Sequence, residues 1–386
     1  MSLTGRLARG LAALDRDGLR RARRTLEGPQ GAMVACDGAT LVNFSSNDYL
    51  GLANDARLRE AAHRAIDELG VGAGASALVS GHSRLHAQAE ERFARFAGLP
   101  RALLFGSGYA ANLGILATLA DRDAEIFSDE LNHASLIDGT RLSRAVVTRY
   151  PHVDLGALEK ALELSTAGTR IVATDAVFSM DGDIAPVKEL LALCERHDAW
   201  LVLDDAHGIG VVGDGGHGTL ERFGIRSPRI VYMGTLGKAL GGYGAFAAGE
   251  PEMIDWLTQR ARTYIYTTAL PPMAAAVAIR AMDTIDSDPS LVANLKARVT
   301  QFRSACAERG IRSSPSESAI HPIVMGAPEA AVKASQDLAA CGLLVPAIRP
   351  PSVPAGTSRL RISLSAAHSP ADVERLAGAL AECVRR

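Results

Sequence analysis

Short apolar runs alternate with segments of helical period along most of this chain. Apolar positions recur at helical spacing over residues 58–69 and 86–96. The short apolar runs predict strands over 101–105, 124–128, 145–150, 170–174, 200–203 and 229–233. Such alternation predicts an α/β fold with a mainly parallel central sheet covered by helices on both faces. The active site of such a sheet lies beyond the carboxyl ends of its strands.

The N-terminal residues follow another pattern. Leu3, Leu7, Leu11 and Leu14 form one stripe of a predicted amphipathic helix. After it, residues 33–44 predict a hairpin that turns at an Asp-Gly pair. We assign residues 1–45 to an N-terminal helix and hairpin segment.

The pattern changes again near residue 283. A long helix carrying Leu291, Leu295, Val299 and Phe302 is followed by apolar runs that predict strands. These predicted strands cover 320–325, 343–348 and 359–364. We therefore expect a large cofactor-binding domain over 46–282 and a smaller C-terminal α+β domain over 283–386.

Composition excludes several classes of protein. The chain has 386 residues, 47% of them hydrophobic, and a formal net charge of -2, so neither nucleic acid nor an anionic membrane is an expected partner. No stretch approaches the roughly 20 apolar residues of a membrane span. Five scattered cysteines without a C-x-x-C pair argue against a disulfide framework and against structural zinc, and suit the cytoplasm.

The most informative feature is Lys238 together with Asp204. Lys238 stands among small residues in Thr-Leu-Gly-Lys-Ala-Leu-Gly-Gly, and Asp204 ends the apolar run that starts at Trp200. A lysine amine can form a Schiff base with the aldehyde of pyridoxal 5'-phosphate, and a carboxylate can keep the pyridine nitrogen protonated. The alternative is a surface lysine near a strand that happens to end in acid.

Other polar groups follow the same strand ends. Gly108 and Tyr109, between a predicted strand and a helix, would offer backbone N–H groups to a phosphate. Ser179 and Thr235 could add hydroxyl donors.

Two histidines follow predicted strands. His133 could stack on a flat heteroaromatic ring, although a lone histidine at this place is more often a helix cap or a packed side chain. His207 could donate to the phenolic oxygen of the cofactor. Two histidines and two aspartates could also indicate a metal site, but their separation over different strand ends and the nearby lysine argue against one.

Arginines mark both ends of the chain. Arg359 and Arg361 share one face of a predicted strand, where a guanidinium could bind the carboxylate of an amino acid. For one of the two, a surface salt bridge is the expected role. The arginine-rich N-terminal helix face is either simply solvated or attracts an anionic substrate.

An ordered set of motifs resembles the α-oxoamine synthase family of fold-type I pyridoxal-phosphate enzymes. The motifs begin at Asn43 (NFSSNDYLGL), Val79 (VSGHS), Gly106 (GSGYAAN), Asn132 (NHAS), Val177 (VFSMDGD), Asp204 (DDAHG), Gly234 (GTLGK) and Ala347 (AIRPPSVPAG). Together they cover essentially the whole chain. The resemblance implies an aminotransferase-like fold and is strongest to the branch that makes 8-amino-7-oxononanoate.

The resemblance also implies roles for single residues. Lys238 would carry the cofactor, Asp204 would lie at the pyridine nitrogen, His133 on the ring and His207 near the phenolic oxygen. The rest of the implied cofactor site is Gly108, Tyr109, Ser179, Thr235 and, from the neighbouring subunit of a homodimer, Thr267. The implied substrate contacts are Arg20, Asn47, His133, Ser352 and Arg361. Asp175 and Ser352 stand where the family usually has glutamate and threonine, and both changes retain the functional group.

The implied reaction is the decarboxylating condensation of L-alanine with a pimeloyl thioester, without a metal. Its products would be 8-amino-7-oxononanoate, CO2 and the free thiol carrier, for biotin biosynthesis. One alternative is a sister enzyme that uses glycine or serine with another acyl-CoA. Another is a catalytically silent regulator that binds the cofactor or acyl-CoA, although Lys238 and Asp204 are both retained.

Overall fold

The computed structural model describes residues 2–384, which divide into two compact units. The central unit contains Asn47–Ser179 and Asp183–Leu295. The terminal unit contains both ends of the chain, up to Ser46 and from Lys296, together with Met180–Gly182. The N-terminal segment therefore belongs to the same compact unit as the C-terminal residues.

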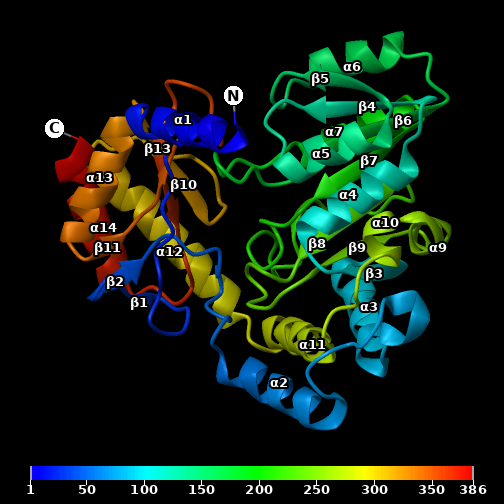
Figure 1. Cartoon of the computed structure of the whole chain (residues 1–386), viewed down its shortest axis with the longest axis horizontal. Coiled ribbons are helices and arrows are strands. Elements are labelled where there is room, and N and C mark those ends of the chain that lie inside the picture. Colours follow the sequence, from blue (N-terminus) through cyan, green and yellow to red (C-terminus); the bar gives the residue numbers. More distant parts are fainter. Residues whose placement is uncertain (1, 385–386) are drawn as a thin grey trace. The chain divides into compact units, whose positions relative to one another are not determined.

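The central unit is built on a seven-stranded sheet of order β3-β9-β8-β7-β6-β4-β5 (Figure 1). The strands are β3 (Arg101–Phe105), β4 (Ala124–Asp129), β5 (Val146–Tyr150), β6 (Thr169–Asp175), β7 (Ala199–Asp204), β8 (Ile230–Thr235) and β9 (Ala245–Gly249). All neighbours pair in parallel except β9, which is antiparallel to both β3 and β8. The predicted mainly parallel sheet is confirmed.

Strand β9 is absent from the sequence-based prediction. Its residues are Ala-Phe-Ala-Ala-Gly, and alanine and glycine have a low preference for strands. All five residues are buried, and Phe246 stacks on Phe93 with ring centroids 4.4 Å apart. Burial between two neighbouring strands therefore outweighs the weak local preference.

Helices cover the central sheet. Those of the central unit are α2 (Ala56–Leu69), α3 (Arg84–Ala97), α4 (Gly108–Leu119), α5 (Ala134–Ser143), α6 (Leu155–Leu164), α7 (Val187–Arg196), α8 (Thr219–Phe223), α9 (Pro251–Arg260), α10 (Arg262–Ile265) and α11 (Pro272–Ser287), with a π-helical turn at Ala77–Gly81. The predicted helices over 58–69 and 86–96 are α2 and α3. Helix α4 contributes Ala111, Ile115 and Leu116 to a core shared with strands of the sheet.

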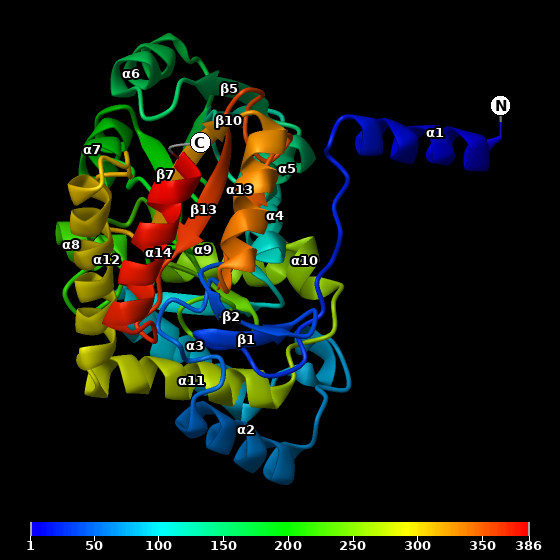
Figure 2. The same ribbon diagram turned by 90° about the vertical axis from the view of Figure 1, so that its left-hand side faces the viewer.

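The terminal unit contains two three-stranded sheets, of order β1-β2-β11 and β10-β13-β12. The strands are β1 (Met33–Cys36), β2 (Ala39–Asn43), β10 (Ile320–Gly326), β11 (Leu343–Leu344), β12 (Ala347–Ile348) and β13 (Ser358–Ser363). The helices are α1 (Leu3–Arg16), α13 (Pro328–Ala340), α14 (Pro370–Val384) and α12 (Ser290–Glu308), which begins in the central unit. Figure 2 shows α13 and α14 beside β10 and β13.

The predicted N-terminal hairpin is confirmed. Strands β1 and β2 pair antiparallel around Asp37 and Gly38, whose φ values are 53° and 75°. Two consecutive residues with positive φ form the turn that best matches the twist of a two-residue hairpin.

One predicted strand is wrong in its extent. Residues 343–348 do not form one strand, because β11 pairs with β2 and β12 pairs with β13. The chain changes sheets around Pro346, which has no N–H to donate to a ladder. The carbonyl of Pro346 instead accepts the N–H of Arg361 at 3.1 Å.

The predicted N-terminal helix is confirmed, but its leucine stripe is not buried. Leu3, Leu7, Leu11 and Leu14 are between 63% and 41% exposed. Within residues 2–384, no helix is long and apolar enough to cross a membrane.

His368 joins the two ends of the chain within the terminal unit. Its Nε2 donates to the carbonyl oxygen of Asn43 at 3.0 Å, and its Nδ1 accepts the N–H of Ser365 at 3.0 Å. The ring also lies 4.2 Å from the Phe44 ring. The bond that Nδ1 accepts from Ser365 needs a neutral imidazole, and burial lowers the pKa of His368 to about 4.

This arrangement predicts acid sensitivity of the terminal unit. The unfolded ring takes up a proton near pH 6.5, while the folded ring resists protonation until about pH 4. Stability is therefore complete above pH 6.5 and falls by roughly 3 kcal/mol as the pH drops through this window. His368→Leu should have a lower free energy of unfolding at pH 7.5, because the two backbone groups lose their partner. Its free energy of unfolding should also fall less steeply than that of the wild-type protein as the pH drops to 4.

Urea unfolding of the wild-type protein and the variant at several pH values measures this difference. His63→Leu, a change at an exposed residue of α2, is the control and should keep the wild-type pH dependence. Parallel pH profiles for the wild-type protein and His368→Leu would contradict the explanation.

Candidate functional site

Polar side chains meet at the carboxyl ends of the parallel strands. Asp129, Asp175, Asp204 and Thr235 are the last residues of β4, β6, β7 and β8. Asp175 and Asp204 lie directly opposite each other in the register of β6 and β7. Lys238 follows β8 by three residues, so the sheet itself brings the predicted lysine and carboxylate to one edge.

Asp204 is a buried carboxylate with two hydrogen bonds. It is 3% exposed, its Oδ2 accepts from Nδ2 of Asn112 at 2.7 Å, and its Oδ1 accepts the N–H of Ala206 at 2.9 Å. Both partners are neutral. An ionised carboxylate in such surroundings is stabilised by a cationic group brought next to it.

The adjacent Asp205 has a structural role. Tyr232 donates its hydroxyl to Oδ2 of Asp205 at 2.7 Å, and the Thr219 N–H donates at 2.6 Å. Burial raises the pKa of Asp205 to about 6. The two neighbouring aspartates therefore serve different purposes, and Asp204 is the one in contact with Asn112.

Asn112 links Asp204 to His133. Its Nδ2 also donates to Oγ of Ser135 at 2.9 Å, and that oxygen lies 2.7 Å from Nδ1 of His133. Among the described residues, the buried Oδ1 of Asn112 has no hydrogen-bond partner. Sequence analysis gave Asn112 and Ser135 no role, because neither residue type indicates a network by itself.

His133 is the N-cap of α5. Its Nδ1 accepts the N–H of Ser135 at 3.2 Å, so a neutral ring carries its proton on Nε2. Desolvation lowers the pKa of His133, the Asp204 charge opposes this shift, and the Lys238 charge adds to it. The capping role that sequence analysis weighed against ring stacking is therefore present, and it fixes the imidazole without using Nε2.

Asp175 is the acid that supports His133. Its Oδ2 accepts the His133 N–H at 2.6 Å, and its own N–H donates to Oδ1 of Asn132 at 3.0 Å. Burial, followed by the charge of Asp204, raises the pKa of Asp175 well above its usual value. Sequence analysis noted Asp175 only as a departure from the family pattern, although its place directly after a buried strand was a usable signal.

The loop that carries Lys238 is fixed by backbone hydrogen bonds. The Leu236 N–H donates to the Gly244 carbonyl at 2.9 Å, and the Gly241 N–H donates to the Lys238 carbonyl at 2.9 Å. Gly241 has φ 65°, and a Cβ there would lie 2.5 Å from the backbone of Leu52. Lys238 is half-buried, and its charge adds to the lowering of the His133 pKa and opposes part of the rise in the Asp175 pKa.

The predicted cofactor residues Gly108, Tyr109, Ser179 and Thr235 lie at or soon after the ends of strands β3, β6 and β8. Gly108 begins α4, and the Tyr109 hydroxyl donates to Asp138. Thr235 donates its hydroxyl to the Gly244 carbonyl at 3.1 Å. Ser179 is half-buried in the loop after β6.

The Tyr49 hydroxyl connects His207 to the predicted substrate residue Asn47. The Tyr49 hydroxyl lies 2.7 Å from Nδ1 of His207 and 3.0 Å from Oδ1 of Asn47. Tyr49 is fully buried and was missed by sequence analysis. Thr267, predicted to serve a neighbouring subunit, is exposed after α10.

The predicted carboxylate-binding arginines belong to the terminal unit, where both are buried on β13. Arg359 forms an ion pair with Asp181 and donates to the Met180 carbonyl at 3.2 Å. The salt bridge expected for one of the two arginines therefore exists, with the Arg359 side chain buried and the Asp181 side chain 35% exposed. Arg361 donates to Oγ of Ser363 at 2.8 Å.

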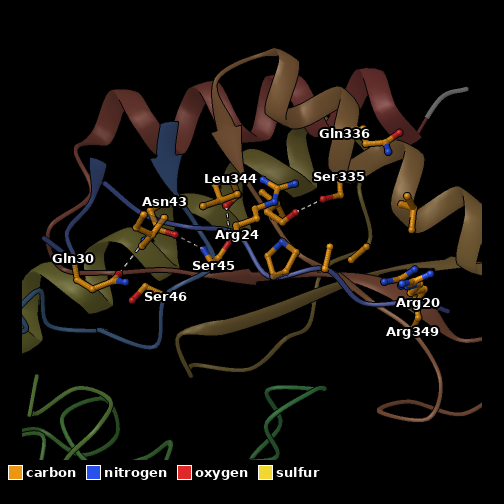
Figure 3. Close-up of a pocket in the computed structure, with 16 residues that line it drawn as sticks. Arg20, Arg24, Gln30, Asn43, Ser45, Ser46, Ser335, Gln336, Leu344 and Arg349 are labelled. Atoms are coloured by element: carbon orange, nitrogen blue, oxygen red, sulfur yellow. Dashed lines mark hydrogen bonds between the residues drawn. The ribbon is translucent and has the colours of Figure 1, made fainter. Parts of the chain in front are cut away.

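Arg20 lines a cavity of about 690 Å³ in the terminal unit (Figure 3). Arg24 and Arg349 also line it, and none of its lining residues in the described chain is acidic. Figure 3 shows Arg20 and Arg349 close together at one end. Arg20 pairs with Asp15 at 2.6 Å, whereas Arg21 is the residue that donates to Ser352, at 3.2 Å.

The central unit fits the implied cofactor. The buried Asp204 matches a protonated pyridine nitrogen, and the half-buried Lys238 follows the neighbouring strand. The unsatisfied Oδ1 of Asn112 is a further buried acceptor beside them. By contrast, no cluster of three histidine, cysteine, aspartate or glutamate side chains in residues 2–384 could hold a metal ion.

Known proteins are similar to this chain over nearly its whole length. The family model described as "Aminotransferase class I and II" matches residues 39–380. An 8-amino-7-oxononanoate synthase of Herminiimonas arsenicoxydans is 52% identical over 380 residues, which cover 96% of this chain and 97% of that protein. The enzyme of the same name from Methylococcus capsulatus is 53% identical over 363 residues, or 94% of each chain.

Solved structures share the fold. A serine palmitoyltransferase from S. paucimobilis, described with a bound PLP-myriocin aldimine, has a TM-score of 0.94 at 28% identity and covers 100% of this chain and 99% of its own. An 8-amino-7-oxononanoate synthase from Francisella tularensis has a TM-score of 0.77 at 29% identity, covering 89% of this chain and 98% of its own. These similarities confirm the predicted fold-type I class and its cofactor, pyridoxal phosphate. The chain belongs to the 8-amino-7-oxononanoate synthase family, within the class I and II aminotransferases.

Proposed function

We propose that this protein condenses L-alanine with a pimeloyl thioester to give 8-amino-7-oxononanoate, CO2 and the free thiol carrier, in biotin biosynthesis. The reaction joins the alanine α-carbon to the acyl carbonyl carbon, and breaks the thioester bond and the bond to the alanine carboxylate. The observation that carries the chemistry is the network Asp204–Asn112–Ser135–His133 beside the Lys238 loop. The choice of substrates is supported by the names of relatives that are 52–53% identical.

When bound, pyridoxal phosphate supplies an aromatic ring that withdraws electrons from the alanine α-carbon. Asp204 would hold the proton on the ring nitrogen, and Asn112 keeps the carboxylate aimed through its 2.7 Å hydrogen bond. Lys238 would hold the cofactor covalently until alanine enters. The freed Nζ would then remove the alanine α-proton and later return one.

His133 and His207 would both orient the cofactor ring, and each histidine is held in place by different residues. The His133 backbone is held by Asp175 and its Nδ1 by Ser135, so the imidazole face would pack on the cofactor with Nε2 available to substrate. Tyr49 holds His207 through Nδ1. Gly108, Tyr109, Ser179 and Thr235 would complete the surroundings of the cofactor.

Two arginine sites would separate the substrate carboxylates. Arg361, which is buried on β13, would bind the alanine carboxylate, as the family resemblance implies, whereas Arg359 forms an ion pair with Asp181. Arg20, with Ser352, would bind the acyl substrate, and the acid-free lining of the Arg20 cavity suits an anionic acyl donor.

The proposal includes a cytoplasmic homodimer. Thr267 would serve the cofactor of the neighbouring subunit, and its exposure after α10 is compatible with that role. Sedimentation at assay concentration checks this part, because a fully active monomer would contradict it.

The central experiment for the function is a substrate panel. Purified protein with pyridoxal phosphate should turn over L-alanine with a pimeloyl thioester faster than glycine or serine with any acyl-CoA. Lys238→Ala should lose turnover by roughly three orders of magnitude or more, because both the covalent anchor and the base are removed. A preference for glycine or serine would identify a sister synthase, and uptake of cofactor without turnover would identify a silent binding protein.

The two arginine sites predict opposite substrate effects. A charge-assisted pair buried from water contributes about 1.5–3 kcal/mol, or roughly tenfold to a hundredfold in affinity. Arg361→Ala should therefore weaken alanine far more than the thioester, and Arg20→Ala should do the reverse. The Arg20 effect should shrink with an acyl chain that lacks the terminal carboxylate.

Separate KM measurements for both substrates test this assignment. Arg23→Ala, at an exposed arginine outside the lining of the Arg20 cavity, is the control for Arg20→Ala and should leave both KM values unchanged. Arg359→Ala removes the ion pair with Asp181 and should not weaken alanine selectively. Equal losses for both substrates in Arg361→Ala and Arg20→Ala would mean that these arginines act structurally.

A further inference from the structure

His152, which the mechanism leaves unused, lies between two carboxylates of the central unit. Its Nδ1 is 3.1 Å from Oδ1 of Asp129, and its Nε2 is 2.9 Å from Oδ2 of Asp183. Asp129 ends β4 and is 1% exposed. Asp183 is the first residue after the Ser179–Gly182 segment. His152 therefore connects a fixed strand end to a loop that carries a predicted cofactor residue.

His152 contacts the residues on either side of the Ser179–Gly182 segment, Phe178 before it and Asp183 after it. Besides its contact with Asp183, its ring packs edge-on against Phe178, with centroids 4.3 Å apart and an interplanar angle of 90°. The Phe178 N–H donates to the Asp183 carbonyl at 3.0 Å, and Val177 and Ile184 form a β-bridge. Ser179 directly follows Phe178, so the direction of the Ser179 side chain depends on how Phe178 and Asp183 are held.

The charges around His152 favour a protonated ring. Burial alone would lower the pKa of His152, but the hydrogen bonds to Asp129 and Asp183 outweigh it and raise the pKa to about 10. Glu130 faces the same residue, and its Oε1 accepts the His152 N–H at 3.1 Å. In the described chain, Oδ1 of Asp183 is buried and has no hydrogen-bond partner, although the side chain as a whole is 36% exposed, so His152 is the charged group that holds this carboxylate in its orientation.

Asp129 is itself held in place. Its Oδ1 also accepts the Leu131 N–H at 2.9 Å, and its Oδ2 accepts the Val153 N–H at 2.8 Å. Val153 has φ 51°, so the turn after His152 adopts a conformation that is uncommon for a β-branched residue. The carboxylate of Asp129 thus fixes the backbone at Leu131, just after β4, and at Val153, just after His152.

We propose that His152 is a positioning residue that, through its ion pairs with Asp129 and Asp183, directs Ser179 toward the bound cofactor. The inference rests on the proposed function, because it takes Ser179 as a cofactor contact. It adds a residue that touches neither cofactor nor substrate. The contribution of His152 is to hold Phe178 and Asp183, which flank the Ser179–Gly182 segment, so that the Ser179 hydroxyl is correctly oriented before the cofactor binds.

A double-mutant cycle on cofactor affinity tests the proposal. The dissociation constant of pyridoxal phosphate is measured by titrating cofactor-free wild-type protein, Ser179→Ala, His152→Gln and the double variant. Ser179→Ala should weaken binding roughly tenfold, the value of one hydrogen bond to a charged group. His152→Gln should weaken binding by a similar factor, and the double variant should be within about twofold of either single variant.

Coupling is the readout that a purely structural role would not give. If His152 only stabilised the fold, the two effects would multiply to roughly a hundredfold, and this result would overturn the proposal. Unchanged affinity in His152→Gln or in Ser179→Ala would overturn it as well. Asp183→Asn should reproduce the behaviour of His152→Gln, and it replaces that variant in the cycle if His152→Gln fails to fold.

The controls separate this inference from the proposed function. His197→Gln changes another histidine near a carboxylate, Glu159 at 3.9 Å, and should leave cofactor affinity at the wild-type value. The visible circular dichroism of bound cofactor should change in His152→Gln and not in His197→Gln. Failure of the wild-type protein to take up cofactor would overturn the proposed function and this inference together, whereas normal uptake with multiplicative effects would overturn this inference alone.

Discussion

A buried carboxylate at the end of β7 is the constraint on which the candidate site depends. Removing Asp204 from water costs several kcal/mol unless the charge is compensated. Asn112 and the Ala206 N–H supply neutral hydrogen bonds, and these orient the carboxylate without cancelling its charge. The site is therefore prepared for a cationic partner, which the protonated pyridine nitrogen of the cofactor would provide. His133 is connected to the same carboxylate through Ser135 and Asn112.

The sheet explains why residues far apart in sequence can form this site. Parallel strands bring Asp175 and Asp204 side by side, and the loop after the next strand carries Lys238. The acids at these strand ends then have different roles. Asp175 holds the backbone of His133, while Asp204 remains directed at the predicted cofactor site. The same sheet edge provides Asp129, which anchors His152.

Sequence patterns predicted the parallel strands and the place of Lys238 and Asp204, because apolar runs and strand-end polarity are local signals. They missed β9, whose alanines and glycine form a strand only because neighbouring strands bury them. They also missed Asn112 and Tyr49, whose contacts join distant segments. The residue-by-residue roles came from resemblance to a family, and the ion pair between Arg359 and Asp181 could be found only from the side-chain contacts.

The role of Asp204 can be measured by NMR as the exchange of the alanine α-proton with solvent in the absence of an acyl donor. Asp204→Asn keeps the shape of the side chain but cannot stabilise a protonated ring nitrogen. Exchange should slow roughly a hundredfold or more in this variant, while alanine binding changes much less. Exchange at the wild-type rate in Asp204→Asn would contradict the role assigned to this carboxylate.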